Sequence, residues 1–195
     1  MDAGEGYEAI LRALQSPARE RYARLLELHR ETLARYTEAV KRIDARAAAR
    51  ASSDGRTMAQ VVAHIADWER YFILAAGELA AGVAWPQFME LKGYLEEDGR
   101  CLQFESVDDF NAYSARRAAG WPWERIQRMA LRAAEVLYAL YTNAEILPIE
   151  TLDASRMYDT EEFGFPLSIP VGWYLWAIAI GHELEEHAQD LQMWD

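Results

Sequence analysis

The sequence predicts an all-α protein, a four-helix bundle with one extra short helix and two long connecting loops. Four long segments repeat their apolar residues at alternating spacings of three and four, which is the period of an amphipathic helix. No segment shows a convincing apolar–polar alternation of the kind that marks a half-buried strand. The chain has 195 residues, 51% of them hydrophobic, and is long enough to bury one core. We expect residues 1–195 to form a single domain.

The first two long helices are predicted from capping signals and apolar stripes. Ser16 followed by Pro17 is typical of an N-cap and a first helical residue. The stripe of this helix is Tyr22, Leu26, His29, Leu33, Tyr36, Val40 and Ile43, in which His29 is interpreted as a core residue. Thr57 is expected to cap the second helix, and Gly82 to end it. The buried face of this helix should consist of Val61, Ile65, Trp68, Phe72, Ala75 and Leu79.

The middle of the chain alternates between helices and connections. The helical period is lost between residues 83 and 105, which indicates a connecting segment without a core role. Ser106 caps a short helix that should stop near Gly120, and residues 121–123 (WPW) begin the next long helix. The stripe of that long helix is Ile126, Ala130, Ala133, Leu137, Leu140 and Ala144. Residues 145–170 are irregular and long for a structureless connection, so they are a candidate lid or binding loop.

The last helix should begin near Pro170 and run to the C-terminus. Its inward stripe is Trp173, Ala177, Ile180, Leu184, His187, Leu191 and Trp194. Its first half, residues 173–180 (WYLWAIAI), is apolar on every face. Such a helix is either central in its domain or shared with a second subunit, so homodimerisation is one of the two interpretations.

The charge and the apolar runs exclude several classes of partner. The net charge of −12 repels phosphate backbones and anionic membrane surfaces, so we expect no nucleic acid as a partner. The first residues lack the basic start and apolar core of a signal peptide, and the only dense apolar run is too short to span a bilayer. We therefore expect a cytoplasmic protein that does not bind membranes, and its single cysteine excludes an internal disulfide.

Three histidines lie in helical segments that a bundle could bring together. His64 lies midway along the second helix, in VVAHIADWER, and the last helix contains GHELEEHAQDLQ with His182 and His187. This arrangement resembles the DinB/YfiT-like superfamily, and the long aromatic connection before the last helix is similar to that of its ClbS/DfsB-like branch. The resemblance implies a four-helix bundle with a divalent metal, zinc or nickel. One histidine of the second helix and two histidines of the last helix, spaced four apart, would hold that metal.

The middle metal ligand departs from this pattern and leaves alternatives open. Glu183 lies four residues before His187, whereas His182 lies five before it and points about 140° away in a regular helix. In the preferred interpretation the helix is regular, and the ligands are His64, Glu183 and His187. In the second, a π-bulge near Gly181 turns His182 onto the face of His187 and restores three histidines. In a third, the site has decayed to an empty polar pocket.

Any of the metal sites requires the segments around His64 and His187 to meet inside the molecule. Imidazoles more than roughly 8 Å apart could not share one ion. The acidic residues near them, Asp67 and Glu69 in one segment and the run at 183–186 in the other, are mostly expected to form a solvated face. One of them, Glu186 or Glu69, is the candidate general base or the group that orients a liganding imidazole.

The resemblance implies a metal-dependent hydrolase or low-molecular-weight thiol transferase that acts on a small electrophilic substrate. Relatives of this type include bacillithiol- and mycothiol-dependent transferases and isomerases, and nothing in the residues selects a thiol over water. The alternative is a non-catalytic bundle that binds or protects a small apolar or aromatic ligand under residues 145–170, with a degenerate metal site. A third interpretation is a purely structural dimer.

Overall fold

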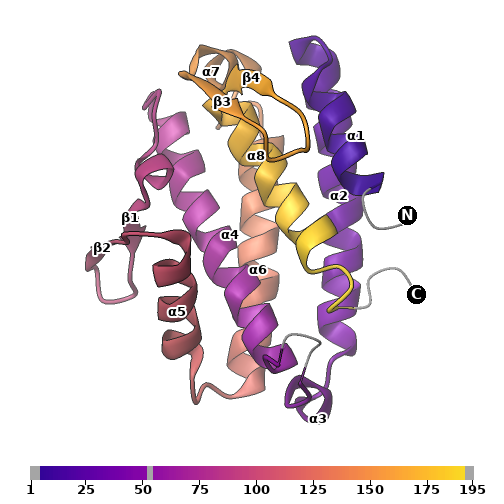
Figure 1. The fold of residues 1–195 in the computed structure, drawn as a ribbon, viewed down its shortest axis with the longest axis vertical. Coiled ribbons are helices and arrows are strands. Elements are labelled where there is room, and N and C mark those ends of the chain that lie inside the picture. The colour runs from indigo at the N-terminus through magenta and orange to yellow at the C-terminus, as the bar shows by residue number, and fades with distance from the viewer. Residues whose placement is uncertain (1–4, 52–54, 192–195) are drawn as a thin grey trace.

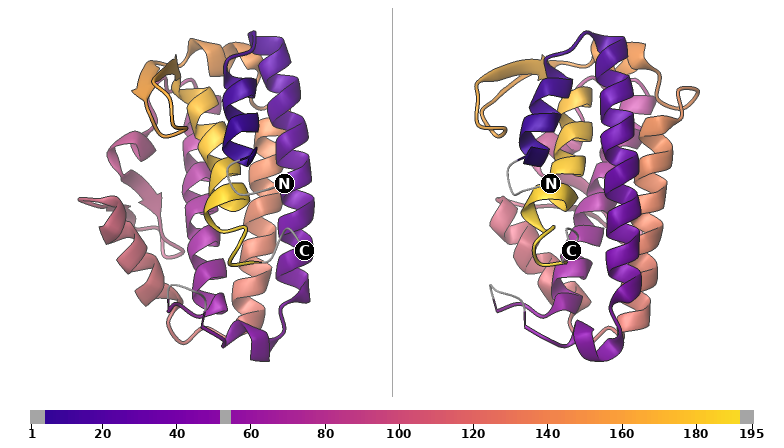
Figure 2. Two further views of the ribbon diagram at one scale, coloured as in Figure 1. Left: turned by 45° about the vertical axis from the view of Figure 1, so that its right-hand side comes forward. Right: turned by 90° about the vertical axis from the view of Figure 1, so that its right-hand side faces the viewer.

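The predicted four-helix bundle is confirmed. The computed structural model describes residues 5–51 and 55–191 of the chain. Its bundle consists of α2 (Ala18–Arg42), α4 (Met58–Ala80), α6 (Trp123–Thr142) and α8 (Val171–Gly181). Helix α4 packs along α6 and contacts α8, while α2 contacts both α6 and α8 (Figure 1). The views in Figure 2 show these helices side by side with their long axes roughly aligned.

Shorter elements surround the bundle. The short helices are α1 (Glu5–Leu14), α3 (Ala45–Ala48), the 3₁₀ helix η1 (Gln87–Glu90), α5 (Val107–Ala118) and α7 (Ile149–Ala154). The strands form two antiparallel hairpins, β1 (Lys92–Leu95) with β2 (Cys101–Gln103), and β3 (Met157–Thr160) with β4 (Leu167–Pro170). Helix α1 lies against α2 and α8, and α5 lies against α4. Within the described residues, we find no helix with the length and apolar character needed to cross a bilayer.

Two of the three predicted capping residues act as expected. Thr57 forms a capping box with Gln60, and the Ser106 side chain caps α5. The prediction for Ser16 is wrong, because its hydroxyl donates to the backbone carbonyl of Arg12 at a distance of 3.0 Å. Ser16 therefore follows the end of α1, a helix that the sequence analysis did not predict.

The two segments that were predicted to be connections contain regular structure. In residues 83–105, the η1 helix and the first hairpin bury Phe88 and Tyr94, so the prediction that this segment has no core role is wrong. Residues 145–170 are not structureless, since they form α7 and the second hairpin. Strands of three or four residues are too short to show a readable alternation, which explains why the sequence pattern missed both hairpins.

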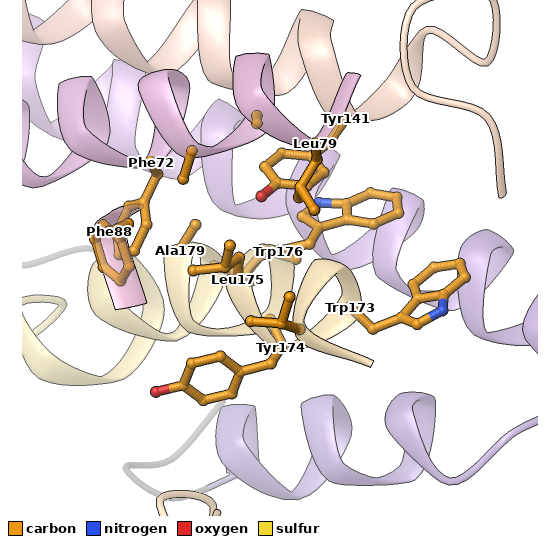
Figure 3. Packing of buried hydrophobic residues seen from close by; sticks show 14 of the residues in the cluster. Phe72, Leu79, Phe88, Tyr141, Trp173, Tyr174, Leu175, Trp176 and Ala179 are labelled. Carbon is orange, nitrogen blue, oxygen red and sulfur yellow. The ribbon is translucent and has the colours of Figure 1, made fainter. Parts of the chain in front are cut away.

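Helix α8 is the centre of the larger hydrophobic core. Trp173, Tyr174, Leu175 and Trp176 are all buried, and Figure 3 shows them packed among residues of the neighbouring helices. The chain itself therefore covers this apolar segment, apart from the half-buried Ile178, as the central-helix interpretation requires. The burial of α8 does not require a second subunit. Homodimerisation stays a prediction.

His29 is a core residue, as predicted. It is buried, and its Nδ1 accepts a hydrogen bond of 3.0 Å from the indole nitrogen of Trp176. Burial lowers the pKa of His29 to about 3, so the ring is neutral at physiological pH. The imidazole therefore has a structural partner within the bundle.

The expectation that Asp67 lies on a solvated face is wrong. Its carboxylate is fully buried and accepts hydrogen bonds from Arg117 at 2.6 Å, from Ser114 at 2.7 Å and from Tyr94 at 3.0 Å. Burial raises the pKa of Asp67 despite the opposing effect of these partners, with Arg117 the strongest of them. The hydrogen bonds of the Asp67 carboxylate thus link α4 to α5 and to the first hairpin.

Candidate metal centre

The last helix does not run regularly to the C-terminus, and this correction decides the geometry of the site. Helix α8 ends at Gly181 and continues as one π-helical turn, His182–Glu186. A π turn bonds residues five apart, so side chains at positions i and i+5 share a face. His182 and His187 therefore point to the same side. Of the predicted inward stripe, Trp194 lies outside the described residues.

Close packing of α1 accompanies the π turn. A Cβ atom placed on Gly181 would lie 3.1 Å from the ring of Tyr7 in α1, which is closer than an ordinary van der Waals contact. The glycine thus allows α1 to approach the end of α8 at the point where the regular hydrogen-bonding pattern changes.

Three histidines from distant parts of the chain converge at this turn. One ring nitrogen from each of His64, His182 and His187 lies within 4.8 Å of the others. The Nε2 atoms of His64 and His182 are 3.4 Å apart. The ring centroids of His64 and His187 are separated by 5.1 Å, so the two segments meet as a shared metal ion requires.

The chemistry of this donor set fits a divalent metal. Burial, followed by the nearby His187 and His64, lowers the pKa of His182 well below its ordinary value, which favours the neutral imidazole that acts as a ligand. Within the described part of the chain, Nδ1 of His182 has no hydrogen-bond partner. Nδ1 of His187 lies 3.3 Å from a carboxylate oxygen of Asp190, which leaves Nε2 as the nitrogen for a ligand bond. Three imidazoles suit zinc or nickel.

Glu183, the preferred middle ligand in the sequence interpretation, does not belong to this cluster. Its side chain is buried against that of Glu69 in α4, and neither residue lines the pocket described below. Burial, and then the charge of Glu183, raises the pKa of Glu69 well above its ordinary value, and burial raises the pKa of Glu183 to about 7. The two carboxyl groups therefore favour a shared proton. The expectation that Glu69 is solvated is wrong for the same reason.

Replacing Glu69 with glutamine should make the metal-free protein more stable at alkaline pH. A carboxyl group whose folded pKa is raised binds more protons when folded, so the stability it contributes falls as the pH rises above the unfolded value of 4.5. Glutamine removes this loss and can donate a hydrogen bond to Glu183. We expect a gain of about 1–3 kcal/mol in the free energy of unfolding at about pH 8, measured by urea denaturation, and little gain at about pH 5.

The control for this experiment is Glu135→Gln, which changes an exposed glutamate on α6. Its free energy of unfolding should differ from that of the wild type by the same small amount at both pH values. If Glu69→Gln is less stable than the wild type at both, the carboxyl pair does not carry the unfavourable charge inferred here.

A cavity of about 310 Å³ opens beside the histidine cluster. His64 and His182 form part of its wall, and most of the remaining lining is aromatic or aliphatic. The lining residues come from α4, η1 and the residue after it, α5, the second hairpin, α8 and the π turn. They are His64, Trp68, Phe72, Phe88, Met89, Leu91, Val107, Asn111, Tyr158, Glu162, Tyr174, Ile178, His182 and Glu186.

Two carboxylates lie at this pocket. An oxygen of Glu186 is 4.0 Å from Nε2 of His182, and the other oxygen accepts a hydrogen bond of 3.3 Å from the hydroxyl of Tyr7. Glu162, from the connection between β3 and β4, accepts a hydrogen bond from the hydroxyl of Tyr174. Burial, followed by the charge of Glu162, raises the pKa of Glu186. Of the two candidate bases, Glu186 is therefore beside the histidines, whereas Glu69 is not.

Several lining residues were not predicted from the sequence. Tyr158 and Glu162 fall in residues 145–170, and the unusual length of that segment was the signal that it contributes to a binding site. Phe88, Val107 and Asn111 gave no such signal, because their contribution depends on how η1 and α5 fold back against α4.

Comparison with known proteins identifies the fold. No family model and no curated protein matches the sequence. The structure is similar to crystal structures of the mycothiol-dependent maleylpyruvate isomerase and of a histidine-to-alanine mutant of that enzyme. The TM-scores are 0.60 at 13% identity and 0.61 at 14% identity, respectively. Both alignments cover 98% of this chain and 63% of the other, so this chain spans less than two thirds of the length of its neighbours. The predicted DinB-like fold is confirmed, whereas membership of the DinB/YfiT-like superfamily and of its ClbS/DfsB-like branch stays a prediction.

Proposed function

We propose that this protein is a metal-dependent enzyme that brings a low-molecular-weight thiol, or water, to a small electrophilic substrate. The observation that carries the proposal is the convergence of three histidines at the wall of a largely apolar pocket. The fold neighbours favour the thiol over water, because their names describe a mycothiol-dependent reaction. Attack by water remains the second form of the same proposal.

Each part of the site has a separate role in this proposal. His64, His182 and His187 would hold the divalent ion, zinc or nickel. When bound, such an ion supplies Lewis-acid character to a thiol or a water molecule. Glu186 lies close enough to the histidines to accept the proton that the nucleophile releases. The aromatic walls exclude bulk water and hold the apolar part of the substrate.

Replacing Asp190 with alanine should weaken metal binding without abolishing it. The contact between Asp190 and Nδ1 of His187 fixes the ring so that its other nitrogen faces the cluster. Loss of such a partner lowers metal affinity by about 10- to 100-fold. Competition with a chromogenic zinc chelator measures this change. Gln189→Ala, which alters an exposed neighbour in the same turn, is the control and should bind zinc like the wild type. If Asp190→Ala binds zinc as tightly as the wild type, Asp190 does not orient the ring of His187 for metal binding.

A direct test of the function compares thiol-dependent and thiol-independent turnover. Zinc- or nickel-loaded protein is assayed with mycothiol and a chromogenic aryl halide, and separately with a nitrophenyl ester in the absence of thiol. We expect saturable thiol consumption that is lost in His182→Ala. Turnover of the ester alone would favour the hydrolase form. If the metal-loaded protein accelerates neither reaction above the His182→Ala variant across a panel of thiols and electrophiles, the protein is not an enzyme of this type.

A further inference from the structure

The charges on the pocket wall point to the substrate class. Among the described residues that line the cavity, the charged side chains are Glu162 and Glu186, and none is lysine or arginine. A substrate with a carboxylate or phosphate group would find no cation of the protein to pair with inside the pocket. The pocket wall therefore disfavours an anionic substrate.

The two carboxylates line the same cavity. Glu186 is beside His182, so a divalent ion on the histidines would offset its charge. Glu162 belongs to the exposed connection of the second hairpin, and a hydrogen bond from the buried Tyr174 holds its side chain. Its negative charge is thus fixed at the solvent-facing side of the pocket.

Two tyrosine side chains line the cavity together with Glu162. The rings of Tyr158 and Tyr174 have their centroids 4.6 Å apart, and both line the cavity. An organic cation is attracted to the faces of such rings as well as to a carboxylate. Trp68, Phe72 and Phe88, which are buried, give the same cavity an apolar surface without charge.

We propose that the substrate pocket takes an organic ammonium compound with an aromatic or aliphatic body. Glu162, Tyr158 and Tyr174 receive the ammonium group, and the apolar body lies between Trp68, Phe72 and Phe88. The electrophilic centre of the compound then faces His64 and His182. This inference rests on the proposed function, because it assigns the substrate class of the same pocket.

The test uses three probes that share one body and differ in charge: 3-phenylpropylamine, 3-phenylpropanol and 3-phenylpropionate. Their binding to the zinc-loaded protein is measured by calorimetry near neutral pH, where the amine is protonated. We expect the amine to bind about tenfold more tightly than the propionate, with the alcohol between them. In Glu162→Gln, affinity for the amine should fall by about three- to fivefold and affinity for the alcohol should stay unchanged. The control Glu161→Gln, at the exposed neighbouring position, should change neither value.

Other outcomes would overturn the inference. Equal binding of the three probes, tighter binding of the propionate, absence of amine binding, or equal losses in the two glutamate variants would each contradict it. Titration of His182→Ala with the same three probes distinguishes a failure of this inference from a failure of the proposed function. A preference for the amine that persists in that variant supports the ammonium site even if the metal-dependent activity fails. Conversely, metal-dependent turnover without any preference for the amine would support the proposed function and contradict the ammonium substrate class.

Discussion

Substitution of His182 with alanine should reduce bound zinc from about one equivalent to less than about a tenth, whereas Glu183→Gln should retain it. The reason is the π turn, which places the ring of His182 within 3.4 Å of the His64 ring and turns Glu183 toward Glu69. Elemental analysis after saturation with zinc and gel filtration measures both variants. Circular dichroism checks that each variant keeps its helical content.

Glu183→Gln is a stringent control because it changes the adjacent buried residue and preserves its shape. In a regular helix the result would be reversed, since Glu183 and His187 would share a face. Loss of zinc in Glu183→Gln together with retention in His182→Ala would restore that register. Retention of zinc in both variants would exclude both sets of three ligands.

Arg117→Met should lower the free energy of unfolding by about 3–5 kcal/mol. The guanidinium of Arg117 is almost fully buried and donates to the fully buried carboxylate of Asp67 at 2.6 Å. Removing the cation leaves that carboxylate poorly compensated in the interior, although Ser114 and Tyr94 still donate to it and Arg70 lies 3.7 Å away. Urea denaturation measures the loss.

The matched control for this prediction is Arg116→Met, at the exposed neighbouring position on α5, for which we expect a change within about 0.5 kcal/mol. The double variant Asp67→Leu with Arg117→Met should recover most of the stability, because it removes both buried charges. A loss of less than about 1 kcal/mol in Arg117→Met would show that the ion pair is not a major contribution.

The bundle could be predicted because each long helix carries a stripe with a clear period. Helices α2, α4 and α6 each extend over twenty residues or more, so the apolar repeat recurs often enough to be distinguished from chance. The strands of the hairpins and α7 span three to six residues each, too few for a period to appear. Helix α1 was not predicted although its pattern is amphipathic, because Ser16 and Pro17 directly after it resemble the start of a helix.

The candidate site could be predicted only in part, because its ligand set depends on the hydrogen bonding of a single turn, His182–Glu186. The resemblance to the DinB/YfiT-like superfamily predicted that His64 and His187 meet, but the choice between His182 and Glu183 depends on a single change of hydrogen bonding near Gly181. Two contacts accompany that change, the packing of Tyr7 against the glycine and the burial of Glu183 beside Glu69. Both are tertiary contacts over long sequence separations, and local spacing carries no signal for them.

X-ray absorption spectroscopy of the zinc-loaded full chain tests the central claim most directly, because it counts the imidazole ligands of the ion. The convergence of His64, His182 and His187 predicts one equivalent of zinc whose spectrum requires three imidazoles. A chain that retains no zinc after saturation, or a spectrum that fits only two imidazoles with a protein carboxylate in place of the third, would contradict it.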